Sequence, residues 1–266
     1  MPTITVDDGS KIYYEVHGQG PRTIVFAHGA AGNHMSWWQQ VPHYRENYRC
    51  LTFDHRGWGA STDATGMSLS GFAGDLDAIL NDAEINDLVL VAQSMGGFTA
   101  LPFAAAYPDR VRGLLMADTV LGVGDEALLA ELRAGFAAMG NPKLKDRLRL
   151  TTMLADSYVE THPEGVFLYQ QVSSLNKPPE ISSDFSTAEG SVSTSELAEL
   201  KTPILFLAGT EDRTMPPALI ERASTLAPNA RYVGIPNTGH SVYWENPKAF
   251  NAMLDELLLE AYPDPE

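Results

Sequence analysis

The chain has 266 residues, of which 44% are hydrophobic and 20% charged, and its formal net charge is −16. This composition is typical of one ordinary globular domain and excludes a largely disordered chain. The negative charge makes binding to nucleic acid or to an acidic membrane surface unfavourable. The first ten residues are polar, unlike a signal peptide, and no run of about 18 apolar residues marks a spanning helix. We therefore expect a cytoplasmic protein with neither nucleic-acid nor membrane partners.

Short apolar segments that we expect to be strands follow one another along the chain. They are residues 4–6, 12–16, 22–27, 50–53, 88–92, 111–116, 204–207 and 231–235. Asp8-Gly9, between the first two segments, is a signal for a two-residue β-hairpin turn. Four of the other segments are apolar without alternation, which is typical of parallel strands buried on both faces.

Segments with helical periodicity alternate with these strands, at residues 72–80, 98–106, 128–139 and 250–259. The alternation predicts an α/β fold, with a mostly parallel eight-stranded sheet and helices on both of its faces. Residues 119–199 interrupt it with helical patterns, a Ser/Thr-rich stretch at 182–195 and no convincing strand. We predict a core of residues 1–118 and 200–266 and a helical cap, residues 119–199, over one edge of the sheet. The Ser/Thr-rich stretch is expected to be a mobile return loop.

The segment from Val89 to Gly97 predicts a nucleophile on a tight turn between a strand and a helix. An apolar strand ends at Ala92 and an Ala/Phe-rich helix begins near Gly97, so Ser94 lies in the turn. Small residues two positions before and after a serine, here Ala92 and Gly96, allow the sharp bend that exposes its hydroxyl. The alternative is an ordinary junction with a helix-capping serine.

Other strand ends supply partners for this serine. Asp212 follows the strand at 204–207, and His240 lies in the loop after the last strand. The chain order Ser94, Asp212, His240 matches the nucleophile, acid and base order of one Ser-His-Asp arrangement. Asp118, after the strand at 111–116, is the alternative acid. Small residues at 29–32, just after the strand at 22–27, leave the backbone free to point an N–H group at a developing oxyanion, together with the N–H of Met95.

Together these motifs resemble those of α/β-hydrolase-fold enzymes, in the capped group that contains 3-oxoadipate enol-lactonases, small carboxylesterases and C–C bond hydrolases. The resemblance covers nearly the whole chain and is carried by residues 28–29, 54–61, 94–97, 107–111, 209–212 and 239–240. The chain departs from the family pattern at Ala92-Gln93, where members usually have Gly followed by His, Phe, Trp or Leu. A polar Gln93 in this position needs a hydrogen-bond partner.

The resemblance implies a serine hydrolase without cofactor or metal, acting on a small or medium carboxylic ester or lactone. Ser94 would attack the carbonyl, His240 would transfer the proton, Asp212 would orient the imidazole, and the N–H groups of Ala30 and Met95 would form the oxyanion hole. Other chemistry with the same triad stays open: C–C bond hydrolysis, perhydrolysis or cofactor-independent oxygenation. A slow-turnover ligand receptor also stays open, as does a homo-oligomer.

The substrate pocket is the least defined part of this prediction. Apolar side chains that are candidates for its lining, with core packing as the alternative for each, are Trp37, Trp38, Met95, Phe136, Met139, Met153, Tyr158, Phe167 and Tyr169. A basic cluster, Lys143, Lys145, Arg147 and Arg149, is a candidate for steering an anionic substrate. A solvated helix face is the alternative for that cluster.

Overall fold

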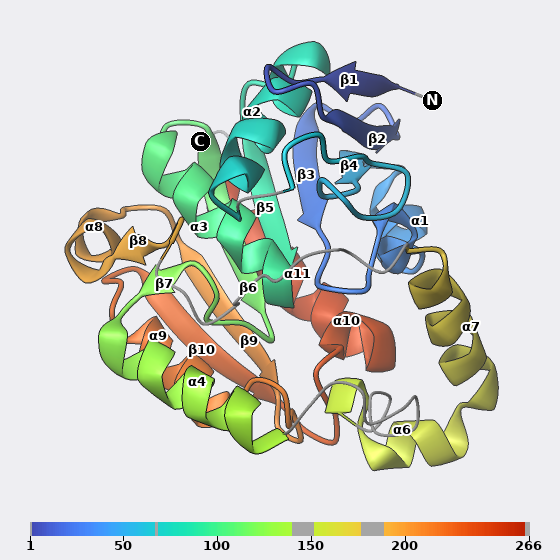
Figure 1. Ribbon diagram of the computed structural model, residues 1–266, viewed down its shortest axis with the longest axis vertical. Helices are drawn as coiled ribbons and strands as arrows, with labels where there is room; N and C mark the ends of the chain where they lie inside the picture. Colours follow the sequence, from blue (N-terminus) through green and yellow to red (C-terminus); the bar gives the residue numbers. More distant parts are fainter. Residues whose placement is uncertain (1, 67–68, 140–151, 177–188, 264–266) are drawn as a thin grey trace.

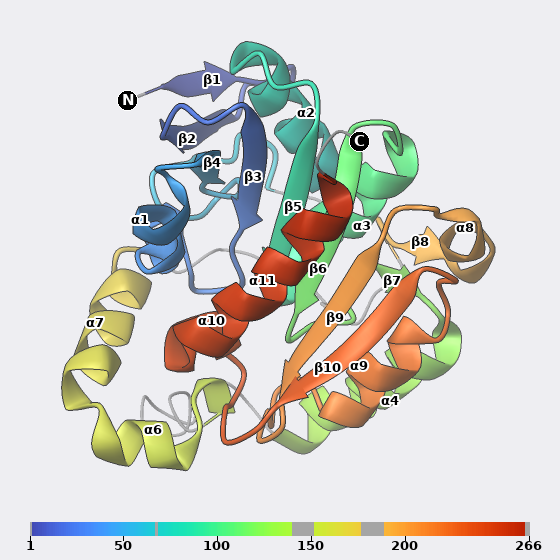
Figure 2. The same ribbon diagram turned by 180° about the vertical axis from the view of Figure 1, so that it is seen from behind.

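The computed structural model describes residues 2–66, 69–139, 152–176 and 189–263 of the chain. A twisted sheet runs through the molecule, with helices on both faces (Figures 1 and 2). The sheet has eight strands in the order β1-β2-β4-β3-β5-β6-β9-β10. Their bounds are Thr3–Thr5, Lys11–His17, Tyr48–Phe53, Arg22–Ala27, Leu88–Gln93, Val111–Ala117, Ile204–Gly209 and Ala230–Ile235, in that order.

The sheet is mostly parallel, as the sequence predicts. Strand β2 pairs antiparallel with β1 and β4, whereas every pair from β4 to β10 is parallel. Alternate residues of a strand face opposite sides, so Ile24 and Phe26 of β3 enter one apolar cluster while Val25 and Ala27 enter the other. The strands in which apolar residues do not alternate with polar ones are therefore buried on both faces. The predicted fold class is confirmed.

Helices cover both faces of the sheet and complete these two clusters. One cluster contains residues of α2 (Phe72–Asp82), α3 (Gly97–Ala106) and α9 (Pro217–Ser224). The opposite cluster contains residues of α1 (Gln40–Tyr44), α10 (Val242–Glu245) and α11 (Pro247–Ala261). None of the helices in the described ranges combines the length and apolar character needed to cross a membrane.

The turn of the first hairpin is one residue longer than predicted. Val6 accepts a hydrogen bond from the N–H of Gly9 and donates its own N–H to Ser10 O, so the loop holds three residues rather than two. Gly9, with a φ of +87°, takes the left-handed position. After the two-residue turn, a three-residue turn that ends with a left-handed glycine is the next most common hairpin connection. Both kinds of turn favour a sequence such as Asp8-Gly9.

The described part of residues 119–199 is mainly helical. Its helices are α4 (Glu126–Met139), α6 (Asp156–Thr161), α7 (Pro163–Ser174) and α8 (Thr194–Glu199). Helices α6 and α7 lie beyond the carboxyl ends of the parallel strands, near α10 (Figures 1 and 2). This position fits a cap over the site, but the division into core and cap remains a prediction.

Two details of this segment differ from expectation. Strands β7 (Val123–Gly124) and β8 (Val192–Ser193) form a short parallel pair, too short to give a pattern in the sequence. The end of the Ser/Thr-rich stretch is ordered, because Ser193 and Glu196 form a reciprocal capping box at the start of α8. Half of the predicted return loop, residues 182–188, lies outside the described residues.

Candidate active site

Ser94 occupies a strained turn between β5 and α3. Strand β5 ends at Gln93, a single turn of 3₁₀ helix spans Ser94–Gly96, and α3 begins at Gly97. The φ of Ser94 is +49°, a left-handed value that is costly for a residue with a Cβ. Such strain persists only where the surrounding structure enforces it, and it is often found at active sites.

The glycines after Ser94 enforce this turn because neighbouring backbone leaves no room for a side chain. A Cβ on Gly96 would lie 2.4 Å from the carbonyl oxygen of Ala27, at the end of β3. A Cβ on Gly97 would lie 2.2 Å from the carbonyl oxygen of Leu121. Before the turn, Ala92 is completely buried in β5, so alanine is accommodated where glycine is usual.

A hydrogen-bonded chain joins Ser94 to His240 and Asp212. The Nε2 atom of His240 lies 3.0 Å from Ser94 Oγ, and its Nδ1 atom lies 2.7 Å from Asp212 Oδ2. Because an ionised carboxylate only accepts, Nδ1 carries the proton and the neutral Nε2 is left to accept the serine hydroxyl. This geometry can activate Ser94 as a nucleophile.

Backbone groups orient the carboxylate of Asp212. Its other oxygen, Oδ1, accepts hydrogen bonds of 2.8 Å from the N–H groups of both Thr214 and Met215. The ring of His240 is buried, which alone would lower its pKa, but the charge and hydrogen bond of Asp212 outweigh this and raise it above the ordinary value. The carboxylate of Asp212 is thus placed to stabilise a protonated His240.

Asp118, the alternative acid, lies near the triad without contacting the imidazole. Its two carboxylate oxygens accept from the N–H of Gly209, at 2.9 Å, and from the N–H of Val242, at 3.1 Å. These bonds tie the end of β9, which precedes the loop of Asp212, to the start of α10, which follows the loop of His240. Complete burial, with the nearby charge of Asp212, raises the pKa of Asp118 well above its ordinary range.

Glu245 is a contributor to the site that sequence reasoning missed. Its carboxylate accepts from the N–H of Gly239 at 3.0 Å and of Ser241 at 3.3 Å, the residues on both sides of His240. It also accepts from the N–H of Ala155, just before α6, at 2.8 Å. Burial raises the pKa of Glu245 to about 7. The sequence carries no signal for this role, because an acidic residue in a short helix is usually solvated.

Gln93 has the partner that its buried position demands. Its Nε2 atom donates a hydrogen bond of 2.8 Å to the carbonyl oxygen of His240. The side chain therefore spans from the turn of Ser94 to the loop of His240. This contact joins residues 147 positions apart, so it could not be read from local sequence.

The predicted oxyanion turn follows β3 and is supported by buried histidines. His28 donates from Nδ1 to the carbonyl oxygen of Gly29 at 2.8 Å and accepts at Nε2 from the N–H of His55 at 3.0 Å. Ala30, the residue after Gly29, lines a small hollow. Met95 lies in the first turn of the helical segment that begins at Ser94, where backbone N–H groups have no intrahelical partner. A Cβ on Gly29, the neighbour of Ala30, would lie 3.0 Å from Ser94 Cβ, so the turn after β3 approaches Ser94. The role of Ala30 and Met95 in an oxyanion hole remains a prediction.

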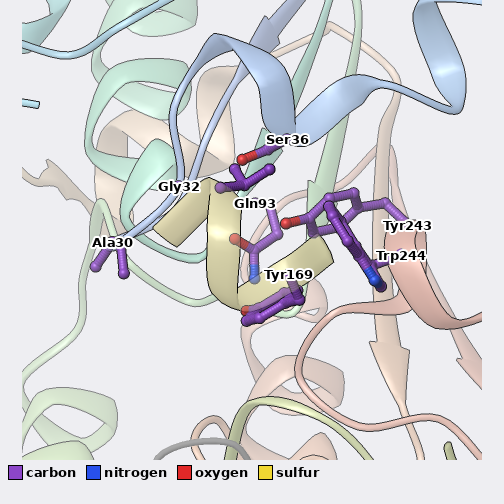
Figure 3. Close-up of a pocket in the computed structure, with 9 residues that line it drawn as sticks. Ala30, Gly32, Ser36, Gln93, Tyr169, Tyr243 and Trp244 are labelled. Atoms are coloured by element: carbon purple, nitrogen blue, oxygen red, sulfur yellow. The ribbon is translucent and has the colours of Figure 1, made fainter. Parts of the chain in front are cut away.

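A small hollow opens beside this turn (Figure 3). The amide of Gln93 and the ring of Tyr169 project into it, and the rings of Tyr243 and Trp244 form one wall. The residues that line it are Ala30, Ala31, Gly32, Ser36, Gln93, Tyr169, Val172, Tyr243 and Trp244. Residues from β5, the oxyanion turn, α7 and α10 therefore meet here, as expected for a substrate pocket.

Most of the predicted pocket residues lie outside this hollow, whereas Tyr169 lines it. Trp37 is fully buried and packs on Phe26 and Tyr243, with ring centroids 5.0 and 4.7 Å away, so it belongs to the core. Tyr158 is buried and stacks on His162. Met95 is fully buried, whereas Phe136 and Met153 pack on the core from half-buried positions. Trp38 is 45% exposed and Phe167 is 62% exposed.

The remaining predictions concern Met139, the basic cluster and a possible metal site. Met139 is the last residue of α4, but the structure does not describe its side chain. The whole basic cluster from Lys143 to Arg149 lies outside the described residues. Among the described residues, no group of three histidine, cysteine or acidic side chains is arranged to hold a metal ion.

A hydrogen-bonded serine–histidine–aspartate chain at the carboxyl edge of a mostly parallel sheet defines a class of protein, the α/β hydrolases. Comparison with known families agrees, since the model of the Alpha/beta hydrolase family matches residues 24–253. The chain therefore belongs to the alpha/beta hydrolase family.

Individual relatives span almost the whole chain. A 2-hydroxy-6-oxononadienedioate/2-hydroxy-6-oxononatrienedioate hydrolase from Cupriavidus pinatubonensis is 27% identical over 96% of this chain and 94% of its own. A 3-oxoadipate enol-lactonase 2 from Acinetobacter baylyi is 24% identical, with 96% of each chain covered. A solved thermophilic esterase from Thermogutta terrifontis has a TM-score of 0.79 at 24% identity, covering 98% of both chains. The chain is thus similar to hydrolases whose named substrates differ.

Proposed function

We propose that this hydrolase cleaves a small or medium carboxylic ester or lactone through an acyl-enzyme on Ser94. The observation that carries the proposal is the continuous hydrogen-bond chain from Ser94 through His240 to Asp212. The enol-lactonase from Acinetobacter baylyi supports the same reaction class.

The reaction then follows from the roles of these groups. Ser94 Oγ attacks the carbonyl carbon while its proton passes to His240 Nε2, and the N–H groups of Ala30 and Met95 stabilise the oxyanion. When the tetrahedral intermediate collapses, the ester C–O bond breaks and His240 returns the proton to the leaving oxygen. Water, activated in turn by His240, attacks the acyl-enzyme and releases the acid.

A second candidate is hydrolysis of a C–C bond by the same triad. It is favoured by the relative from Cupriavidus pinatubonensis, which is named for a 2-hydroxy-6-oxononadienedioate substrate. Such a substrate carries two carboxylates, whereas no residue that lines the hollow is charged. We therefore rank ester and lactone hydrolysis first.

The test is hydrolysis of p-nitrophenyl esters of increasing acyl length and of simple lactones. We expect many turnovers by the wild type and a loss of about a thousandfold or more in Ser94→Ala. Ser224→Ala is the matched control, because Ser224 is a buried serine of α9 that bonds only to the carbonyl oxygen of Glu221. Equal activity of wild type and Ser94→Ala, or no activity in either, would refute the proposal.

A further inference from the structure

The hollow beside Ser94 contains one amide that the triad does not use. Gln93 is 5% exposed, and its side chain projects into the hollow between Gly32 and Tyr169 (Figure 3). Its Nε2 atom donates to the carbonyl oxygen of His240, and because a carbonyl only accepts, this contact fixes which end of the amide is nitrogen. The amide oxygen Oε1 therefore lies on the opposite side.

The amide oxygen lies close to the reacting serine. A Cβ built on Gly29 would be 2.0 Å from Gln93 Oε1 and 3.0 Å from Ser94 Cβ, so both atoms lie within 3.0 Å of one point. An acyl group bonded to Ser94 Oγ would have its first carbons within reach of Oε1. Gly29 has no side chain to separate the two.

The other polar side chains of the hollow already have partners. Ser36 Oγ accepts a hydrogen bond of 3.1 Å from the N–H of Asn33, the hydroxyl of Tyr243 interacts with that of Ser36, and Tyr169 Oη lies 3.1 Å from Ser241 Oγ. Gln93 Oε1 accepts no hydrogen bond from any residue that the structure describes. An acceptor that has no protein partner and faces a hollow is satisfied by water or by a donor group of a ligand.

We propose that Gln93 Oε1 selects an acyl group that carries an uncharged hydrogen-bond donor, a hydroxyl or amide N–H, near the carbonyl carbon. The inference rests on the proposed ester hydrolysis and names its substrate class. None of the residues that line the hollow is charged, and the chain itself has a net charge of −16. A carboxylate in this hollow would lose its hydration without gaining a counter-charge.

The test compares two p-nitrophenyl esters of the same shape, the 3-hydroxybutanoate and the 3-methylbutanoate. Each kcat/KM is divided by the rate of alkaline hydrolysis of that ester, which removes the difference in intrinsic reactivity. We expect the wild type to favour the hydroxy ester about tenfold, because the methyl group leaves Oε1 unpaired. The hemisuccinate ester, which carries a carboxylate, should be slower than both.

Gln93→Met removes the amide at similar length and should bring the ratio of the two esters close to one. Because the result is a ratio, a general loss of rate from disturbing His240 does not affect it. Gln39→Met is the matched control and should keep the wild-type ratio. Gln39 also donates to a backbone carbonyl, that of Trp244, at 3.1 Å, but it does not line the hollow.

The outcomes separate this inference from the proposed function. A wild-type ratio of one or below, a Gln93→Met variant that keeps the wild-type ratio, or a preference for the hemisuccinate would overturn the inference while leaving ester hydrolysis intact. Failure of every ester to react faster with wild type than with Ser94→Ala would instead refute the ester hydrolase itself.

Discussion

The turn that carries Ser94 and the loop that carries His240 are held in place in different ways. The nucleophile turn is fixed by close backbone packing, since a Cβ on Gly96 or Gly97 would lie within 2.4 Å of a carbonyl oxygen. The base loop is fixed by side chains, because Gln93, Asp118 and Glu245 each bond to its backbone or to the residues around it. The small residues that allow close packing are visible in the sequence next to Ser94, whereas Gln93 and Asp118 bond to groups that lie 147 and 124 positions away.

Gly96→Ala tests whether close backbone packing fixes the turn of Ser94. Of the changes that test this comparison, it has the largest expected effect. The new Cβ would press on the carbonyl oxygen of Ala27, at the end of β3, and would move the oxyanion turn away from Ser94. We expect a loss of about 1–3 kcal/mol in the free energy of unfolding and of about a hundredfold in kcat/KM. Urea unfolding and ester hydrolysis measure the two effects.

Gly74→Ala is the matched control for this change. No atom lies within 4 Å of a Cβ at Gly74, in α2, so alanine there should be neutral or stabilising by up to about 1 kcal/mol. If both alanine variants behaved alike, close packing would not be what fixes the turn.

Asp118→Asn tests the buried hydrogen bonds around the base loop. Asparagine has a single acceptor oxygen, so it would present an N–H group to the N–H of either Gly209 or Val242. We expect a loss of about 1–3 kcal/mol in the free energy of unfolding, because one buried donor becomes unsatisfied. The same change at Asp109, which is exposed, should stay within about 0.5 kcal/mol. Equal unfolding midpoints for the two variants would remove Asp118 from the support of this loop.

The difference between the two regions also explains what the sequence could predict. The strands, Ser94 and the order of Asp212 and His240 follow from apolar runs and small residues that are close together in the chain. The contact of Gln93 with His240 spans 147 residues, and that of Asp118 with Val242 spans 124. No local pattern specifies such pairs.

The pocket lining was the weakest prediction for a related reason. An apolar side chain such as Trp37 gives the same sequence signal in a core as in a pocket, and only tertiary packing distinguishes them. Tyr169, which does line the hollow, was among the candidates, whereas Tyr243 and Trp244 were not. Both residues lie in α10, just after His240, and their position depends on the turn between His240 and this helix.

Glu245→Gln tests whether the carboxylate next to the base loop positions His240. In the wild type, kcat/KM should rise with pH through the pKa of His240, above its ordinary value of 6.5, because only the neutral imidazole is a base. The charge of Glu245 contributes to that raised pKa, so the variant should show the rise at lower pH. We also expect about a tenfold lower kcat/KM, since glutamine keeps only one acceptor for the N–H groups of Gly239, Ser241 and Ala155.

The readout for Glu245 is the pH profile of kcat/KM between pH 5 and 9. Glu164→Gln, an exposed change on α7, is the control and should leave the profile unchanged. A lower rate with an unmoved pH midpoint would mean that Glu245 only stabilises the loop.

The smallest effect is expected at the exposed ion pair between Arg213 and Asp156. This pair joins the loop of Asp212 to α6 through bonds of 2.6 and 3.1 Å, but both side chains are at least half exposed. Exposed pairs are screened by water and salt, so Arg213→Gln should change the unfolding midpoint by about 2 °C or less. The double variant with Asp156→Asn, measured by thermal unfolding, gives the coupling between the two side chains. A shift as large as that of Asp118→Asn would show that surface charge, rather than buried hydrogen bonds, holds α6 against the site.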